Sequence, residues 1–242
     1  MWRDDLRGIY YTAMKDIKTY YLKPPAISWG IVFPVAWILA FYLRSPRAFE
    51  DLVPGLIAMT ILFSTTAAEA VVINFELRIG SLERLLLAPL TFSAVLLGKV
   101  LGGAIFGLLM TALVTICSVV GLGLHVNVVQ LVLIIGPSLF AFSAMGALLC
   151  VLVKEVFEAQ TLANLPRFLM MFLSGVFYPL SAMPPLLRYV AYLLPLTYTV
   201  EGIRHALSPT DTVPVLIDSL ILIAVAVIFT APAIKLLRRR FL

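Results

Sequence analysis

Charged side chains are scarce in this sequence: Asp, Glu, Lys and Arg make up 13% of its 242 residues, about half their share in an average soluble domain. Apolar residues make up 62% of the chain, and the mean hydropathy is +1.04. A soluble fold of this size could not bury so much apolar surface. The composition therefore excludes a water-soluble catalytic domain and predicts an all-α integral membrane protein.

Cysteine and histidine are also too few to build a reactive centre. Cys117 and Cys150 both lie within apolar runs, which argues against a disulfide framework and against a cysteine zinc site. His125 and His205 are far apart in the sequence and do not form a His/Cys cluster. We therefore expect no catalytic residue and no metal site in this chain.

Six apolar runs are each long enough to cross the hydrocarbon core of a bilayer. They lie at about 26–43, 52–74, 92–120, 128–153, 162–180 and 213–234. In the third run Gly98, Gly102, Gly103 and Gly107 form small-xxx-small steps, which predict close packing of helices. We expect residues 26–242 to form one domain with six spans. An even number of spans places both ends of the chain on the same side of the membrane.

Residues 1–25 precede these runs and have the pattern of an amphipathic helix. Leu6, Tyr10, Ala13, Ile17 and Tyr20 recur at spacings of four and three, which places them on one helical face. A helix rich in Lys, Arg and Tyr of this kind suits the membrane interface. The alternative is a solvated helix that merely precedes the first span.

The basic residues are distributed unevenly between the two sides of the predicted topology. If the N-terminus is cytoplasmic, all of the 18 Lys and Arg residues lie inside except Arg44, Arg47, Arg188 and Arg204. Lys and Arg are enriched in cytoplasmic loops of membrane proteins. We therefore expect a multi-pass protein of the cytoplasmic (inner) membrane with both termini in the cytoplasm.

The segment from about 181 to 210 is apolar but does not have the pattern of a seventh span. Prolines divide it into two pieces that are too short to cross about 30 Å at about 1.5 Å per residue. A re-entrant helical hairpin on the extracellular side fits best; the alternative is an interfacial helix pair that seals the bundle. Its candidate residues are Pro184, Pro185, Arg188, Tyr192, Pro195, Tyr198, Glu201 and Arg204, of which Glu201 and Arg204 are spaced to form an ion pair.

The connector between the second and third runs, at about 76–90, has the composition of a docking helix. Ser81 can cap a helix whose first turn contains Glu83 and Arg84, and Pro89 ends it. Leucines form one face of this short helix. A free loop gains nothing from projecting charge and leucine into the cytosol, so the pattern predicts that a partner protein binds here.

This connector resembles the coupling helix of permease subunits of ABC-2-type (type V) ABC transporters. In that family it has the form E-x-x-x-G-[ST]-L-E-x-L followed by proline, and it inserts into a groove of the ATPase. The stretch from Leu173 to Arg204 resembles the fifth span and extracellular re-entrant helices of the family, and residues 1–25 resemble its connecting helix. The residues in the coupling segment are Glu76, Arg78, Gly80, Ser81, Leu82, Glu83, Arg84, Leu85 and Pro89.

The resemblance implies the transmembrane subunit of an ATP-driven exporter that performs no covalent chemistry itself. Its partners would be two ABC ATPase subunits, which bind ATP and Mg²⁺, a second copy of this permease or a homologous one, and membrane lipid, with no nucleic acid. The chain itself lacks a phosphate-binding loop, because its one Gly-Lys pair has Ser93 and Val100 where that loop needs glycine and a hydroxyl residue. We expect no cofactor in this chain.

The expected substrate is an amphiphile: a drug, a lipid or a lipid-linked natural product. The candidate pathway or gate residues are Glu69, Met170, Met171, Phe172, Phe177 and Tyr178. Thioether and aromatic side chains form adaptable apolar surfaces, and a carboxylate within a span should face the protein interior or water. Plain core packing, and a structural hydrogen bond for Glu69, remain the alternatives for these positions.

Two other functions remain open. A lipid-linked polysaccharide is the first alternative substrate, although a sugar path favours aromatics with more hydrogen-bonding partners. The second alternative, of another class, is an ATP-independent secondary transporter or channel. It requires coupling carboxylates at the midplane of internally repeated halves, whereas this sequence shows no repeat and only Glu69.

Overall fold

The computed structural model describes residues 2–23, 50–86, 90–153, 155–208 and 212–241, with a few isolated positions between 32 and 43. Every regular element in these residues is helical. The elements are α1 (Trp2–Asp16), the π-helical turn η1 (Ile17–Tyr21), η4 (Glu50–Leu52), α4 (Val53–Arg78), α5 (Ser81–Leu86), α6 (Phe92–Leu122), α7 (Val128–Leu152), α8 (Val156–Leu173), η5 (Leu180–Ala182), α9 (Pro185–Tyr192), α10 (Pro195–Ala206) and α11 (Thr212–Phe241).

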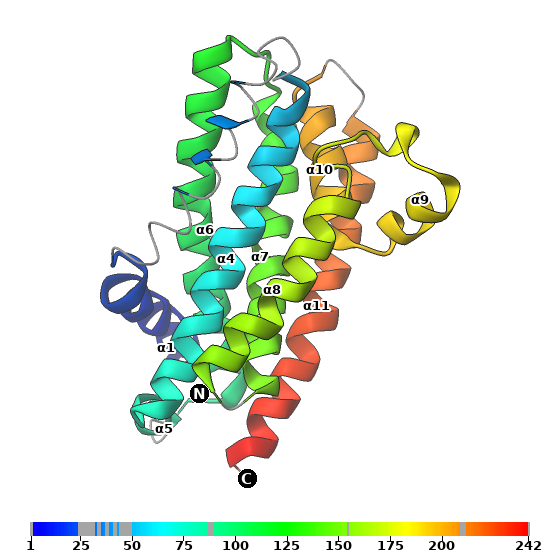
Figure 1. Cartoon of the computed structure of the whole chain (residues 1–242). Helices are drawn as coiled ribbons and strands as arrows, with labels where there is room; N and C mark the ends of the chain where they lie inside the picture. Colours follow the sequence, from blue (N-terminus) through cyan, green and yellow to red (C-terminus); the bar gives the residue numbers. More distant parts are fainter. Residues whose placement is uncertain are drawn as a thin grey trace.

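Helix α4 lies at the centre of the bundle and packs against α6, α7, α8 and α10 (Figure 1). A helix that is apolar around its whole circumference is buried on all sides, and 93% of the most apolar stretch of α4 is buried. Its hydroxyl residues bond within the helix: Thr60 donates to the Leu56 carbonyl at 2.9 Å and Thr65 to the Ile61 carbonyl at 2.8 Å. These polar groups therefore need no partner outside the helix.

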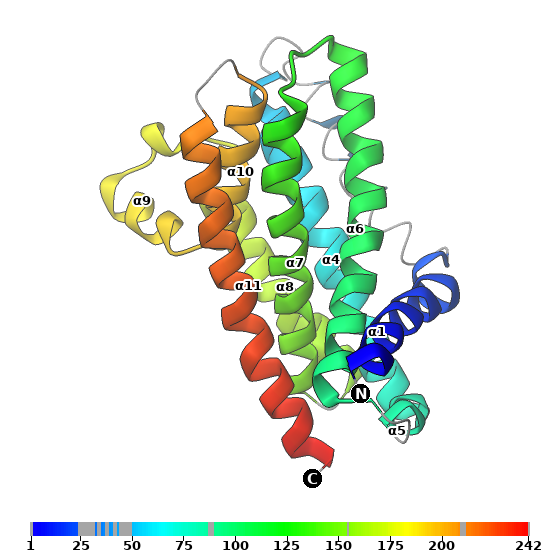
Figure 2. The same ribbon diagram turned by 180° about the vertical axis from the view of Figure 1, so that it is seen from behind.

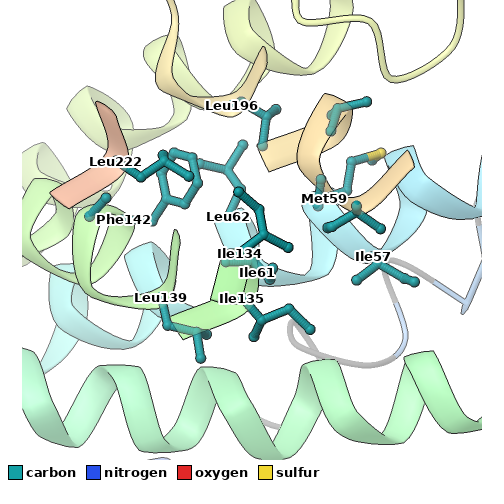
Figure 3. Packing of buried hydrophobic residues seen from close by; sticks show 14 of the residues in the cluster. Ile57, Met59, Ile61, Leu62, Ile134, Ile135, Leu139, Phe142, Leu196 and Leu222 are labelled. Atoms are coloured by element: carbon teal, nitrogen blue, oxygen red, sulfur yellow. The ribbon is translucent and has the colours of Figure 1, made fainter. Parts of the chain in front are cut away.

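The main hydrophobic core lies between α4, α7, α10 and α11 (Figure 3). Ile61 and Leu62 from α4 meet Phe142 from α7, and Leu196 from α10 and Leu222 from α11 complete the contact. All five side chains are buried. Burial of apolar side chains at this end holds α10 inside the bundle.

Among the described residues, four helices are long and apolar enough to cross a membrane: Glu50–Glu76, Phe92–Leu122, Val128–Leu152 and Thr212–Arg240. They confirm the second, third, fourth and sixth predicted runs as long apolar helices. The first predicted run, 26–43, lies almost entirely outside the described residues.

The fifth predicted run, 162–180, differs from the structure in its bounds. Helix α8 begins at Val156 and ends at Leu173, and the chain then continues without helix to Leu180. The helix ends because Ser174 leaves helical geometry and Gly175 adopts a positive φ of 79°, a conformation that glycine reaches without strain. Residues 174–179 include no charged side chain, so composition did not mark the end of the helix.

Close approach between helices depends on the glycines of α6. A Cβ atom on Gly98 would lie 2.8 Å from Cβ of Thr12 in α1, closer than real side chains come. A Cβ on Gly107 would overlap Thr65 of α4. These contacts agree with the helix packing expected from the small-residue spacing.

The two ends of the chain lie at the same end of the bundle as α5, and α10 lies at the opposite end (Figures 1 and 2). Helix α1 is oblique to the bundle and packs against α6. Thr91 caps α6 by accepting a hydrogen bond from the Ala94 amide at 3.1 Å, and Asn127 caps α7 by accepting one from the Gln130 amide at 3.3 Å. The bundle therefore has one end with both termini and α5 and another with the proline-divided segment.

Candidate functional site

Four charged side chains meet between α1, α4 and α6 at the α5 end of the bundle; we call them the ionic junction. Lys99 Nζ donates to Glu76 Oε2 at 2.6 Å and to Asp16 Oδ2 at 3.1 Å. Lys15 contacts Glu76 Oε1 as well and lies 3.2 Å from Asp16 Oδ1. Two cations thus face two carboxylates, and the junction is neutral as a group.

Three of the four side chains in the ionic junction are buried, so the fold depends on their charges being balanced. The side chains of Asp16 and Glu76 are 0% exposed and that of Lys99 is 1% exposed, whereas Lys15 is 35% exposed. Burial raises the pKa of the Asp16 carboxyl above its usual range, and the Lys99 ammonium acts in the opposite direction. Removing one member of such a group leaves an uncompensated buried charge, so all three helices depend on the junction being complete.

The predicted coupling segment begins within the ionic junction, at Glu76. Glu76 lies in the last turn of α4, the chain turns at Gly80 with a φ of 67°, and α5 starts at Ser81. Arg78, Ile79 and Arg84 are exposed at this end, while Leu82 is fully buried in a second core cluster with residues of α6 and α7. Leu85 is half-buried and packs against that cluster.

The structure shows which helix each residue of the predicted coupling segment belongs to, and the bounds differ from those predicted. Glu76 and Arg78 belong to α4, so the free helix is Ser81–Leu86 instead of the whole range 76–90. Glu76 is buried and bound by two lysines, so its carboxylate is not part of the exposed surface where the sequence predicts docking. Pro89 and the side chain of Glu83 lie outside the described residues.

Glu69 lies in the interior between α4, α6 and α7. Its Oε1 accepts a hydrogen bond from the Tyr21 hydroxyl at 3.0 Å and a longer one from Ser143 at 3.4 Å. Gly103 of α6 faces it so closely that a Cβ there would overlap Glu69 Oε1. The side chain is 0% exposed, so in this structure it packs inside the subunit as a hydrogen-bond acceptor.

The other candidate pathway residues fall on two sides of α8 and its following loop. Met170 and Met171 are buried in the main core. Phe172 is 56% exposed and Tyr178 is 69% exposed, and the Phe172 ring lies 5.8 Å from that of Phe177. The structure therefore pairs the Phe172 and Phe177 rings, while Met170 and Met171 lie in the main core, against which Phe177 also packs.

The proline-divided segment forms two short helices, neither of which could span a bilayer. Pro185 and Pro195 each stand in the first turn of α9 and α10, with Pro184 as the residue before α9. Helix α10 is largely buried against α7 and α11, while α9 projects from the side of the bundle (Figure 1). The prediction of two proline-bounded pieces is confirmed.

Hydrogen bonds tie these two helices to their surroundings. Arg188 donates to three loop carbonyls, those of Leu180, Ser181 and Met183, at 2.8 to 3.2 Å. The Tyr198 hydroxyl donates to the Tyr192 carbonyl at 2.6 Å. The expected Glu201–Arg204 ion pair is confirmed at 2.9 Å, and Arg204 also donates to the Gly175 carbonyl at 3.3 Å, which links α10 to the loop after α8.

A cavity of about 500 Å³ opens at this end of the bundle. Phe177 and Arg204, both candidates from the sequence, line it together with Glu50 and Asp51 of η4, the short helix directly before α4. Phe177 supplies an apolar wall, and the three charged residues supply a polar rim. The cavity can therefore accommodate a molecule that has both an apolar part and a polar or charged part.

Two buried cations were missed as site residues by the sequence reasoning, which counted them only among cytoplasmic basic residues. Lys99 lies inside α6, and Arg167 lies inside α8 at 1% exposure. Arg167 donates to Thr66 at 2.5 Å and to Asn164 at 2.9 Å, and its guanidinium lies 5.9 Å from the centre of the Phe63 ring. The available signal was a basic residue within an apolar run, which demands a buried partner.

Comparison with known proteins agrees with this architecture. Residues 7–208 match the model of the family described as ABC-2 type transporter. The chain is 30% identical over 204 residues to the probable multidrug ABC transporter permease YbhS of Escherichia coli K12, covering 81% of this chain and 54% of that protein. It is 28% identical over 196 residues to the inner membrane transport permease YadH of the same strain, covering 78% and 75%.

A third relative is nodulation protein J of Sinorhizobium fredii, which is 30% identical over 167 residues, or 66% of this chain and 62% of that protein. The chain spans about half the length of YbhS and three quarters of YadH. The family match covers most of the described helices, from α1 to α10. The chain belongs to the ABC-2 type transporter family.

Proposed function

We propose that this chain is the permease subunit of an ATP-driven exporter that moves amphiphilic substrates outward and is powered by a separate ABC ATPase. The observation that carries the proposal is the exposed turn and short helix from Arg78 to Leu86, which stand at one end of a bundle of the ABC-2 type. The relative YbhS is named as a probable multidrug transporter. An apolar surface on α8 supports a substrate of similar character.

The α5 end is the docking face in this proposal. Arg78, Ile79 and Arg84 present charge and an apolar side chain at the tip, while Leu82 anchors the helix in the core. A partner can thus bind an exposed side of α5 without unfolding its buried side. Because the ATPase is a cytoplasmic protein, this end and both chain termini face the cytoplasm.

The ionic junction transmits movement from the docking face into the bundle. α5 is joined to α4 by the turn at Gly80, and the last turn of α4 is tied through Glu76 to Lys99 of α6 and Lys15 of α1. When the ATPase subunits close on ATP, a displacement of α5 is therefore shared by three helices. Without these ion pairs, α4 could move while α1 and α6 stay in place.

The exposed face of α8 lines the path in an assembly with a second permease. Leu165, Phe168, Leu169 and Phe172 recur at spacings of three, one and three and are 43% to 73% exposed. This stripe leads to Phe177 and to the cavity at the opposite end. A surface of this kind offers an amphiphile apolar contacts along α8 and a charged rim at the exit, with α9 and α10 as the extracellular helices.

The docking assignment can be tested by charge reversal. Arg84→Glu should weaken co-purification of the ATPase with tagged permease and reduce efflux of the dye ethidium from cells, because it inverts the charge of an exposed docking residue. Lys235→Glu, an equal charge reversal on an exposed part of α11, is the control. Wild-type ATPase binding and wild-type efflux in Arg84→Glu would contradict the assignment of α5 as the docking helix.

A further inference from the structure

A long apolar groove lies on the membrane face of the bundle, away from α8. Its floor is α7, where Gly136 and Pro137 leave room, and its walls are Leu97 of α6 and Val227 and Ile234 of α11. Figure 2 shows α7 between these two helices on this face. The groove has a volume of about 720 Å³. We call it the α7 groove.

The length of the α7 groove corresponds to one leaflet of a bilayer. It follows α11 from Ile223 to Ile234, which at about 1.5 Å per residue is about 17 Å. Half the hydrocarbon thickness is about 15 Å. The apolar run of α11 is 213–234, so the groove covers the half of that run nearer the C-terminus.

The lining offers almost nothing to a polar partner. Its hydroxyl residue is Thr230, which already donates to the Ala226 carbonyl at 2.7 Å. A second cavity of about 510 Å³ between α6 and α7 shares Gly136 and Phe140 with the groove and is also lined mainly by apolar residues. Together the two cavities accept flexible hydrocarbon more readily than a protein segment with backbone hydrogen bonds to satisfy.

Basic residues follow directly after the C-terminal end of the groove, which is at Ile234. Val227, Ala231, Ile234 and Arg238 follow one another at spacings of four, three and four, so Arg238 continues the face of α11 that lines the groove. Arg238 is exposed, whereas Arg240 is used by the fold and donates to the Val153 carbonyl at 3.0 Å. Lys235 is exposed beside the same face.

From these observations we propose that the α7 groove binds the acyl chain of an anionic phospholipid whose phosphate lies against Arg238. The length of the groove matches that of an acyl chain in one leaflet, and the positive charge beyond its end favours an anionic headgroup. A Lys or Arg near the surface contributes enough attraction to favour an anionic lipid about fivefold. The site is separate from the proposed substrate path, because the path follows α8 on another side of α4.

Two variants remove the two parts of the site without disturbing the core. A Cβ atom on Gly136 would meet nothing within 4 Å, so Gly136→Leu should fill the groove without a clash; Gly136→Ala is its control. Arg238→Gln removes the charge from the groove face. Arg239→Gln makes the same change on the next residue, about 100° around the helix, and is the matched control.

The experiment is native mass spectrometry of the purified full chain titrated with phosphatidylglycerol or phosphatidylcholine of equal acyl length. Wild type and Arg239→Gln should bind phosphatidylglycerol about fivefold better, Arg238→Gln should bind the two lipids about equally, and Gly136→Leu should lose most binding of both. Equal binding of the two lipids by wild type, or an unchanged preference in Arg238→Gln, would overturn the proposal. Full lipid binding by Gly136→Leu would also overturn the proposal. If Gly136→Leu instead failed to pair with a second permease while its lipid content stayed unchanged, the groove would be assigned to the second permease copy and the proposal would be overturned.

Discussion

Lys99→Met removes the ammonium group that contacts both Asp16 and Glu76. Both carboxylates are fully buried, and breaking a buried ion pair by removing one partner costs about 3–5 kcal/mol. Lys15 still contacts both carboxylates, but it is 35% exposed, so solvent screening limits its compensation. We therefore expect the free energy of unfolding to fall by about 3 kcal/mol, which for a chain of this size lowers Tm by about 6–12 °C.

The assay is the thermal unfolding of purified permease in one detergent, with intrinsic fluorescence as the probe. Lys235→Met, which removes an exposed lysine of α11, should leave Tm within about 2 °C of wild type, because an exposed surface charge contributes little to stability. A Tm of Lys99→Met equal to that of Lys235→Met would refute the reasoning, since a buried ammonium shared by two carboxylates could not then be important for stability.

A triple variant separates charge from packing in the same assay. Lys99→Met combined with Asp16→Asn and Glu76→Gln removes the charges of all three buried side chains while nearly preserving their volumes. The triple variant leaves no uncompensated charge at the three buried positions, and such a charge is the main cost of breaking a buried ion pair, so most of the lost Tm should return. If the triple variant were as unstable as Lys99→Met, the loss would arise from packing around the lysine stem and not from uncompensated charge.

Two further predictions concern packing and topology. Gly103→Ala should lower Tm by several degrees, because its Cβ would lie 2.6 Å from Ser143 Oγ and would overlap Glu69 Oε1. Gly136→Ala places its Cβ in open space and should be neutral or stabilising by about 0.5–1 kcal/mol. Equal effects of the two changes would contradict the packing at Gly103. In a background without Cys117 and Cys150, single cysteines at Asn127 and Ser181 should react with an impermeant thiol reagent from outside intact cells, and one at Ser81 should not. Labelling at Ser81 alone would reverse the proposed orientation and place α5 away from the ATPase.

Hydropathy was sufficient to predict a helical membrane protein and the approximate place of four long spans, because a bilayer selects for length and apolarity whatever the neighbouring helices are. Prolines were sufficient to divide the segment at 181–210, since their backbone restricts where a helix can begin. The end of α8 could not be predicted in the same way. The residues from Ser174 to Pro179 include no charged side chain, and the backbone geometry at Gly175 shows that the helix has ended.

The sequence by itself thus determined the class of protein, the presence of a short helix at 81–86 and the local ion pair of Glu201 with Arg204, because hydropathy, motif spacing and contacts within one helix are local properties. Only the tertiary structure decided which charges meet across helices. Lys99 is 83 residues from Asp16 and 23 from Glu76, and no local pattern connects them. Their contact exists because Gly98 lets α1 approach α6, which encloses the lysine between two carboxylates and excludes water from all three.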